Sequence, residues 1–92
     1  MIVRIATEDQ YRLPDADAER LNQLDNDAVA AVEAGDEDRF HEVFEEMLNL
    51  VRTDGHKLDE DELEESDVIL PPPDLSFTEA HLEFSGDGLI PD

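Results

Sequence analysis

The sequence contains no cysteine. A disulfide framework, a thiolate metal site and a cysteine nucleophile are therefore excluded, and packing must stabilise the fold. This absence is compatible with a reducing compartment. The 92 residues fit one domain, residues 1–92, because a chain of this size buries only about 60–65% of its unfolded surface and two smaller cores would not be stable.

Long apolar runs are also missing. Residues 1–13 lack the basic start and the apolar run of about 7–15 residues that mark a signal peptide. No stretch approaches the roughly 20 apolar residues needed to cross a bilayer. We therefore expect a cytoplasmic protein with no direct membrane insertion.

Positive charge is scarce. Only 6 residues are Lys or Arg, with Lys57 as the single lysine, whereas 27 are Asp or Glu, which gives a net charge of −21. A field of this sign repels phosphate backbones and offers no counterion release on binding, so we expect no nucleic-acid partner. The same field opposes the anionic lipids of the cytoplasmic leaflet.

Three explanations compete for this acidity. Intrinsic disorder is disfavoured because Leu, Val, Ile and Phe recur with a clear period. Cation binding is the second explanation. The third, which we favour, is adaptation to molar salt, where the Debye length falls to about 3 Å and hydrated carboxylates keep the surface soluble. The scarcity of lysine and the spread of acids through every segment support it.

The N-terminal part predicts a β-hairpin and a first helix. Residues 1–5 are rich in β-branched side chains and, with residues 11–13, predict a hairpin whose loop 7–9 closes without glycine. Asp15 is expected to cap a helix of about 19 residues, and Gly35 to end it in the left-handed conformation. The apolar stripe of this helix is Leu21, Leu24, Ala28, Ala31 and Val32.

The second helix shows the clearest periodicity. Asp36 is expected to cap it and Gly55 to end it, and the short connection makes the two helices antiparallel. Its apolar positions follow the i, i+3, i+4, i+7 pattern without a miss. They are Phe40, Val43, Phe44, Met47, Leu48 and Val51.

The C-terminal part alternates acidic and proline-rich segments. Residues 56–67 indicate a solvated loop or a frayed helical turn, and the prolines at 71–73 impose an extended rod. Residues 76–79 form a capping box that opens a short helix, which residues 85–88 end. The predicted class is α+β: an N-terminal β-hairpin packed on an antiparallel helical hairpin, followed by a proline-rich extended segment and a short C-terminal helix.

No constellation of residues indicates catalysis. The serines, Ser66, Ser76 and Ser85, do not lie in a Gly-x-Ser-x-Gly elbow, and no glycine-rich phosphate loop is present. Carboxylates are so frequent that a pair of them discriminates nothing. We therefore predict no enzyme, no catalytic residue and no cofactor.

A divalent-cation site is the rival hypothesis. His41 lies four residues from both Glu37 and Glu45, along one flank of the second helix. This row runs beside the apolar stripe, so a solvated helix face is the favoured interpretation. An EF-hand beginning at Asp59 fails, because Glu64 stands where the turn needs glycine. We predict no metal ligands.

Two apolar, proline-containing segments remain as candidates for contact with a partner. They either cover the core or form a rigid docking surface, since a preformed extended segment loses little entropy on binding. The candidate residues are Leu70, Pro71, Pro72, Pro73, Leu89, Ile90 and Pro91.

These segments carry a resemblance to a known family. The relevant stretches are MIVRI and QYR at 1–5 and 10–12, AVEAGDE at 31–37, SDVILPP at 66–72 and GLIP at 88–91. In order and spacing they resemble the PspA-associated protein family, PspAA, and this chain looks like an acidic, haloarchaeal-like member. The resemblance covers essentially the whole length.

The resemblance implies an accessory protein linked to phage shock protein A (PspA), a coiled-coil protein that remodels membranes in the envelope stress response. It implies no enzyme and no cofactor. Our hypothesis is a non-enzymatic module that binds a PspA-like protein and modulates its assembly or membrane engagement. Its rivals are a divalent-cation-binding protein and a structural subunit of a homo-oligomer.

Overall fold

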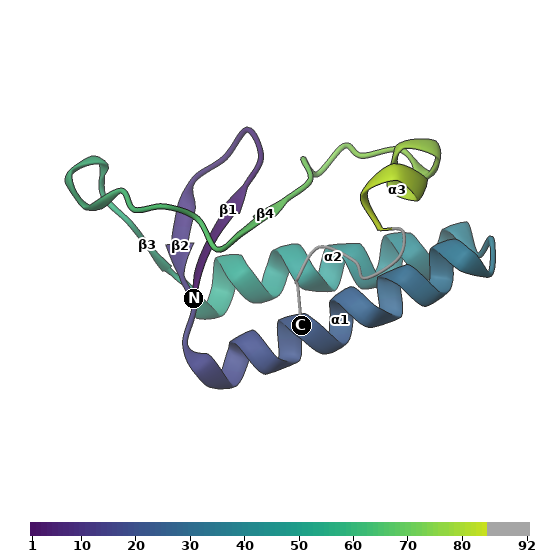
Figure 1. Ribbon diagram of the computed structural model, residues 1–92, viewed down its shortest axis with the longest axis horizontal. Coiled ribbons are helices and arrows are strands. Elements are labelled where there is room, and N and C mark those ends of the chain that lie inside the picture. The colour runs from purple at the N-terminus through teal and green to yellow at the C-terminus, as the bar shows by residue number, and fades with distance from the viewer. Residues whose placement is uncertain (85–92) are drawn as a thin grey trace.

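The structure is a computed structural model that describes residues 1–84. Figure 1 shows a pair of long antiparallel helices as one layer, with a small sheet above one end and a short helix above the other. The α+β class and this order of elements confirm the prediction. The elements are β1 (Ile2–Ile5), β2 (Gln10–Arg12), α1 (Asp15–Glu33), α2 (Glu37–Asp54), β3 (His56–Lys57), the 3-10 turn η1 (Glu60–Glu62), β4 (Val68–Leu70) and α3 (Phe77–Glu83).

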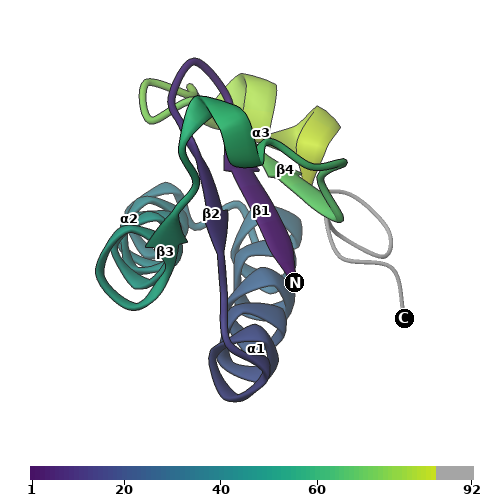
Figure 2. The same ribbon diagram turned by 90° about the vertical axis from the view of Figure 1, so that its left-hand side faces the viewer.

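The predicted hairpin is the centre of a four-stranded sheet in the order β3-β2-β1-β4. Figure 2 shows the strands side by side in this order. β1 pairs antiparallel with β2, with Val3 opposite Tyr11, and parallel with β4, with Val3 opposite Val68. Val3 and Ile5 alternate with Arg4 and are fully buried in the core, as the two-residue period of a strand requires.

Thr7 closes the hairpin without glycine by adopting a left-handed backbone, with φ of 67°. The amide of Glu8 donates to the carbonyl of Ile5 at 2.8 Å, and the amide of Ile5 donates to the carbonyl of Asp9 at 3.2 Å. A β-branched residue is rare in this region of backbone space, because its Cβ crowds the following carbonyl. The turn therefore holds local strain.

The first helix lies where it was predicted, but a different residue caps its beginning. Pro14, with an extended backbone at φ −60° and ψ 153°, is the capping residue, and its carbonyl accepts from the amides of Asp17 and Ala18. Asp15 is already helical, and no side chain caps this end. The prediction of Asp15 as the cap was therefore wrong, because proline itself supplies the extended backbone of that position.

The second helix confirms its prediction at both ends and along its stripe. The carboxylate of Asp36 accepts from the amide of Arg39 at 3.1 Å, and Gly35 is left-handed, with φ of 70°. Gly55 follows the last helical residue in an extended conformation. All six apolar positions of the stripe are buried, and Phe40 and Phe44 stack with their ring centroids 5.6 Å apart.

The short C-terminal helix also follows its prediction. Ser76 and Glu79 form the capping box, with the Ser76 hydroxyl accepting from the amide of Glu79 at 3.2 Å. Phe84 is buried and meets Phe40 edge to face, with centroids 5.2 Å apart. This contact fastens α3 to the beginning of α2. The expectation for residues 85–88 lies outside the described residues.

Two strands were not predicted. β3 has two residues, and Lys57 pairs with Tyr11. β4 lies in the segment after the acidic loop and pairs with β1, which is more than 60 residues away in the sequence. Residues 58–67 between them carry η1 and the buried Leu58. The 3-10 turn agrees with the second alternative predicted for this segment, a helical turn, rather than with a solvated loop.

Candidate functional site

The predicted contact residues of the proline segment divide between core and surface. Leu70 is fully buried and Pro71 is buried, whereas Pro72 is half-buried and Pro73 is exposed. Leu70 and Pro71 therefore belong to the core and offer a partner no surface, because β4 directs Leu70 against the helices. Leu89, Ile90 and Pro91 lie outside the described residues. Within residues 1–84, the candidate contact residues that expose surface to a partner are therefore Pro72 and Pro73.

Pro73 borders a hollow along the second helix. This hollow, of about 310 Å³, we call the α2–Pro73 groove. Phe44 and Leu48, from the buried stripe of α2, give it an apolar floor, and charged side chains form its rim. Such a floor with a polar rim is the usual composition of a docking groove. The groove is lined by His41, Phe44, Glu45, Leu48, Arg52 and Pro73.

The hairpin turn is fastened beside this groove. Arg52 donates to the carboxylate of Glu8 from Nε at 3.1 Å and from Nη2 at 2.5 Å. A two-pronged guanidinium–carboxylate contact fixes orientation as well as distance. Asp9 of the same turn forms a second ion pair, at 3.4 Å, with Lys57 on β3. The strained turn at Thr7 is therefore held in place by α2 and β3.

His41 does not gather a metal site in the described residues. Its Nε2 lies 3.7 Å from Glu37, both side chains are exposed, and Glu45 lies with His41 along the groove. Within residues 1–84, no group of three or more His, Cys, Asp or Glu side chains is placed to hold a metal ion. The row is an exposed helix flank, and His41 and Glu45 from it line the groove.

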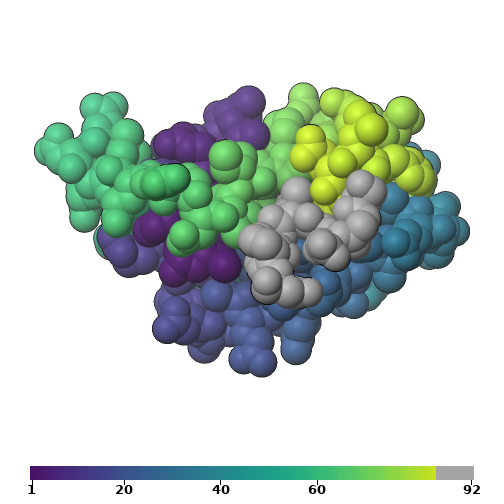
Figure 3. Space-filling model, in the orientation of Figure 1, coloured from purple at the N-terminus to yellow at the C-terminus, as the bar shows by residue number. Residues whose placement is uncertain are grey.

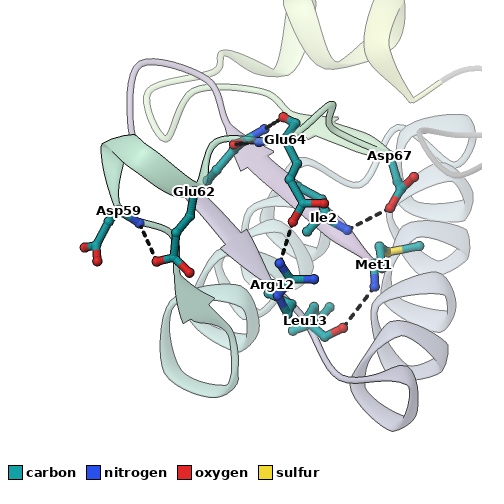
Figure 4. Close-up of polar contacts among 9 residues, drawn as sticks. Met1, Ile2, Arg12, Leu13, Asp59, Glu62, Glu64 and Asp67 are labelled. Carbon is teal, nitrogen blue, oxygen red and sulfur yellow. Dashed lines mark hydrogen bonds and ion pairs between the residues drawn. The ribbon is translucent and has the colours of Figure 1, made fainter.

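Gln10 fastens the acidic segment to the sheet. Its buried side-chain amide donates to the carbonyl of Glu64 and to the hydroxyl of Ser66 at 2.7 Å, and accepts from the amide of Glu64 at 3.2 Å. Arg12 forms an ion pair with Glu64, and Asp67 accepts from the amide of Ile2 at 2.8 Å (Figure 4). Sequence reasoning missed this role of Gln10, because its partners lie more than 50 residues away.

The fastened segment covers part of the sheet. Figure 3 shows the acidic segment that leads to β4, residues 59–67, lying across the N-terminal strands. Leu63 in this segment is exposed over 56% of its surface, and Ile69 on the edge strand β4 over 59%. The acidic segment is therefore a strap over the outer face of the sheet, away from the helix layer.

A second hollow lies between the two long helices. This hollow, of about 330 Å³, we call the α1–α2 hollow, and it is lined by Arg20, Leu24, Glu46, Leu50, Thr53 and Asp54. Arg20 and Glu46 form an ion pair across it at 3.5 Å. Asp17 lies beside Asp54 at the edge of this hollow, and its pKa is raised above its usual value. The largest cause is a hydrogen bond with the Asp54 carboxyl, followed by partial burial and by the charge of Asp54. Asn49 lines both this hollow and the α2–Pro73 groove.

Among residues 1–84, neither long helix combines the length and the apolar character that a membrane crossing requires. Comparison with known proteins adds one finding. The family model PspAA, described as PspA-Associated protein, matches residues 1–92, which is the whole chain. Searches of the curated proteins and of the solved structures returned no match.

Proposed function

We propose that this chain, which belongs to the PspA-associated protein family, is a non-enzymatic accessory protein. In this proposal it binds a PspA-like coiled-coil protein and modulates the assembly or the membrane engagement of that protein. The match over the full length is the observation that carries this proposal. The family description names an association with PspA, and the sequence offers no constellation of residues typical of catalysis.

The α2–Pro73 groove is the surface that we assign to this binding. The groove has an apolar floor between α2 and a turn at Pro73, which the amide of Leu75 closes by donating to the carbonyl of Pro72 at 3.0 Å, so the chain does not continue here as the extended rod expected for 71–73. Such a floor suits a partner helix that inserts one apolar side chain. Pro73 and the fastened turn at Glu8 are held by the fold, so little conformational entropy is lost when a partner docks against them. Of the candidate contacts predicted from the sequence, this assignment retains Pro73. It adds His41, Glu45 and Arg52 as new candidates.

The proposal also covers the setting of the protein. We place it in the cytoplasm, where a PspA-like protein meets the membrane, and interpret its acidic surface as adaptation to a salt-rich interior. Under these conditions long-range attraction is screened, so short-range contacts in a groove must provide the affinity.

Co-elution with the PspA homologue encoded in the same genome, in molar salt, tests the proposal. Wild-type protein is expected to co-elute and to change the size of PspA assemblies. Pro73→Asp, which places a charge at the rim of the groove, is expected to reduce the bound fraction about tenfold. Leu63→Asp is the matched control, because Leu63 is also an exposed apolar residue but lies on the strap. No co-elution of wild type contradicts direct binding.

A further inference from the structure

The α1–α2 hollow combines an apolar floor with carboxylates at its rim. Leu24 is buried and Leu50 is half-buried, and both line the hollow between the two helices. Glu46 and Asp54 stand at the rim, and only Arg20 among the lining residues is cationic. This arrangement suits a side chain that is apolar along its length and positive at its end.

The negative charge at this rim is only partly balanced. Arg20 is engaged with Glu46 at 3.5 Å. Asp54 lies within hydrogen-bonding reach of Asp17, from the other helix, and among residues 1–84 neither carboxylate forms an ion pair with a cation. Two neighbouring carboxyl groups disfavour double ionisation, and the hydrogen bond to Asp54, with burial and the Asp54 charge, raises the pKa of Asp17. An added positive charge here would relieve that repulsion.

We propose that the α1–α2 hollow receives a Lys or Arg side chain of the protein partner, with its aliphatic stem over Leu24 and Leu50 and its cationic head at Asp54 and Asp17. This inference rests on the proposed function and names the chemistry of the partner's contact. Charge-assisted hydrogen bonds to two carboxylates give such a contact both strength and direction.

The position of the hollow fits the same partner helix. The α2–Pro73 groove and the α1–α2 hollow lie on opposite flanks of α2, and Asn49 lines both. A short side chain on the ridge between two hollows lets a partner backbone approach closely. One helix lying across α2 then places an apolar side chain in the groove and a basic one in the hollow.

A small free cation fits this site less well. Leu24 and Leu50 give an ion no ligands, and within the described residues no three acidic or histidine side chains converge here. A lipid surface fits no better, because the chain carries a net charge of −21 and anionic headgroups would be repelled. A basic side chain on a protein uses both the floor and the rim.

The test is the affinity of the double variant Asp17→Asn and Asp54→Asn for the PspA homologue, measured by calorimetry in molar salt. The two amides keep the shape of the hollow and remove its charge. Binding is expected to weaken about tenfold, the range of a charge-assisted contact. The control, Glu60→Gln with Glu65→Gln, removes two charges from the exposed strap and is expected to change affinity less than about twofold.

Two further measurements separate the possible outcomes. The double variant should fold at least as stably as wild type, because it removes repulsion, and thermal unfolding checks this. Replacing the contacting Lys or Arg of the partner by Gln should weaken wild type but not the double variant. If the double variant binds like its control, the basic contact is wrong and the proposed function stands. If wild type does not bind, both fail.

Discussion

Gln10 stabilises the fold through an amide that lies within the sheet yet bonds outward to the strap. Replacing it by alanine leaves the backbone of Glu64 and the hydroxyl of Ser66 without these hydrogen bonds. We predict that Gln10→Ala lowers the free energy of unfolding by about 1–3 kcal/mol, the cost of losing three partly buried hydrogen bonds. Denaturant unfolding in molar salt measures it. Gln23→Ala, on the exposed face of α1, is the control and should change stability little.

Gly55 is required for space rather than for a left-handed backbone. A Cβ at this position would lie 2.3 Å from the carbonyl oxygen of Val51 and 3.0 Å from Cβ of Tyr11. We predict that Gly55→Ala lowers the free energy of unfolding by about 1–3 kcal/mol, because the last turn of α2 must open at Val51 and β2 must shift at Tyr11. Denaturant unfolding tests this, and a loss of less than about 0.5 kcal/mol would contradict the close packing.

Gly35 offers a contrasting case at the other end of the helix pair. Its φ is 70°, and a Cβ at this position would meet no atom within 4 Å. Its requirement is conformational, so Gly35→Asn, which tolerates this backbone, should restore part of the stability that Gly35→Ala loses. Gly55→Asn should be no more stable than Gly55→Ala, because the requirement at Gly55 is for space. Denaturant unfolding of the Ala and Asn variants at both positions makes the comparison.

Asp17 predicts a dependence of stability on pH. Its pKa is raised in the folded state by the hydrogen bond to Asp54, partial burial and the Asp54 charge, so the folded protein binds this proton more tightly than the unfolded chain. Protonation of Asp17 therefore adds stability as the pH falls from 7 through its raised pKa. Above that pKa the folded protein carries the full cost of an ionised Asp17 beside Asp54. Thermal unfolding from pH 7 to pH 4 should show a weaker rise for Asp17→Asn than for wild type.

The comparison at pH 7 has a matched control. Asp17→Asn should unfold at a higher temperature than wild type, since the repulsion is removed. Asp15→Asn removes the same charge from the same first turn of α1, where a carboxylate favours the helix dipole, and should not raise the unfolding temperature. Equal behaviour of the two variants would show that Asp54 has no special effect on Asp17.

At the scale of elements, local patterns predicted the helices and missed half of the sheet. The six-residue stripe of α2 and the caps at Gly35 and Asp36 are written in neighbouring residues, so their period and turn chemistry are visible in the sequence. β3 has only two residues, and β4 depends on β1 from the other end of the chain. A pairing of that kind leaves no local period to detect.

The candidate site was predictable only in part for a related reason. Pro73 and Leu70 were both candidate contacts because they stand in one conspicuous apolar, proline-containing segment. The pairing of β4 with β1 buries Leu70, which agrees with the alternative that this segment covers the core, while Pro73 remains a proposed contact. The groove itself arises where Pro73 meets α2, and the hollow where α1 meets α2. Such junctions depend on tertiary packing, which the helix pattern alone does not locate.

At the scale of the whole molecule, the most unusual property is the net charge of −21. Below roughly 0.1–0.2 M salt, where the Debye length reaches about 8–10 Å, we predict that repulsion among the carboxylates loosens or unfolds the domain. Far-ultraviolet circular dichroism across a salt series measures the loss of helix. A spectrum unchanged between dilute buffer and molar salt would refute the interpretation of the acidity as salt adaptation.

The central claim is that a PspA-like protein docks on the outer side of α2. Amide chemical shifts of the labelled protein, recorded in molar salt while the PspA homologue is added, test it most directly. We predict saturable changes at His41, Asn49 and Arg52, along the groove and the hollow, and none at the strap near Glu62. Changes confined to the strap, or no changes at all, would contradict the claim.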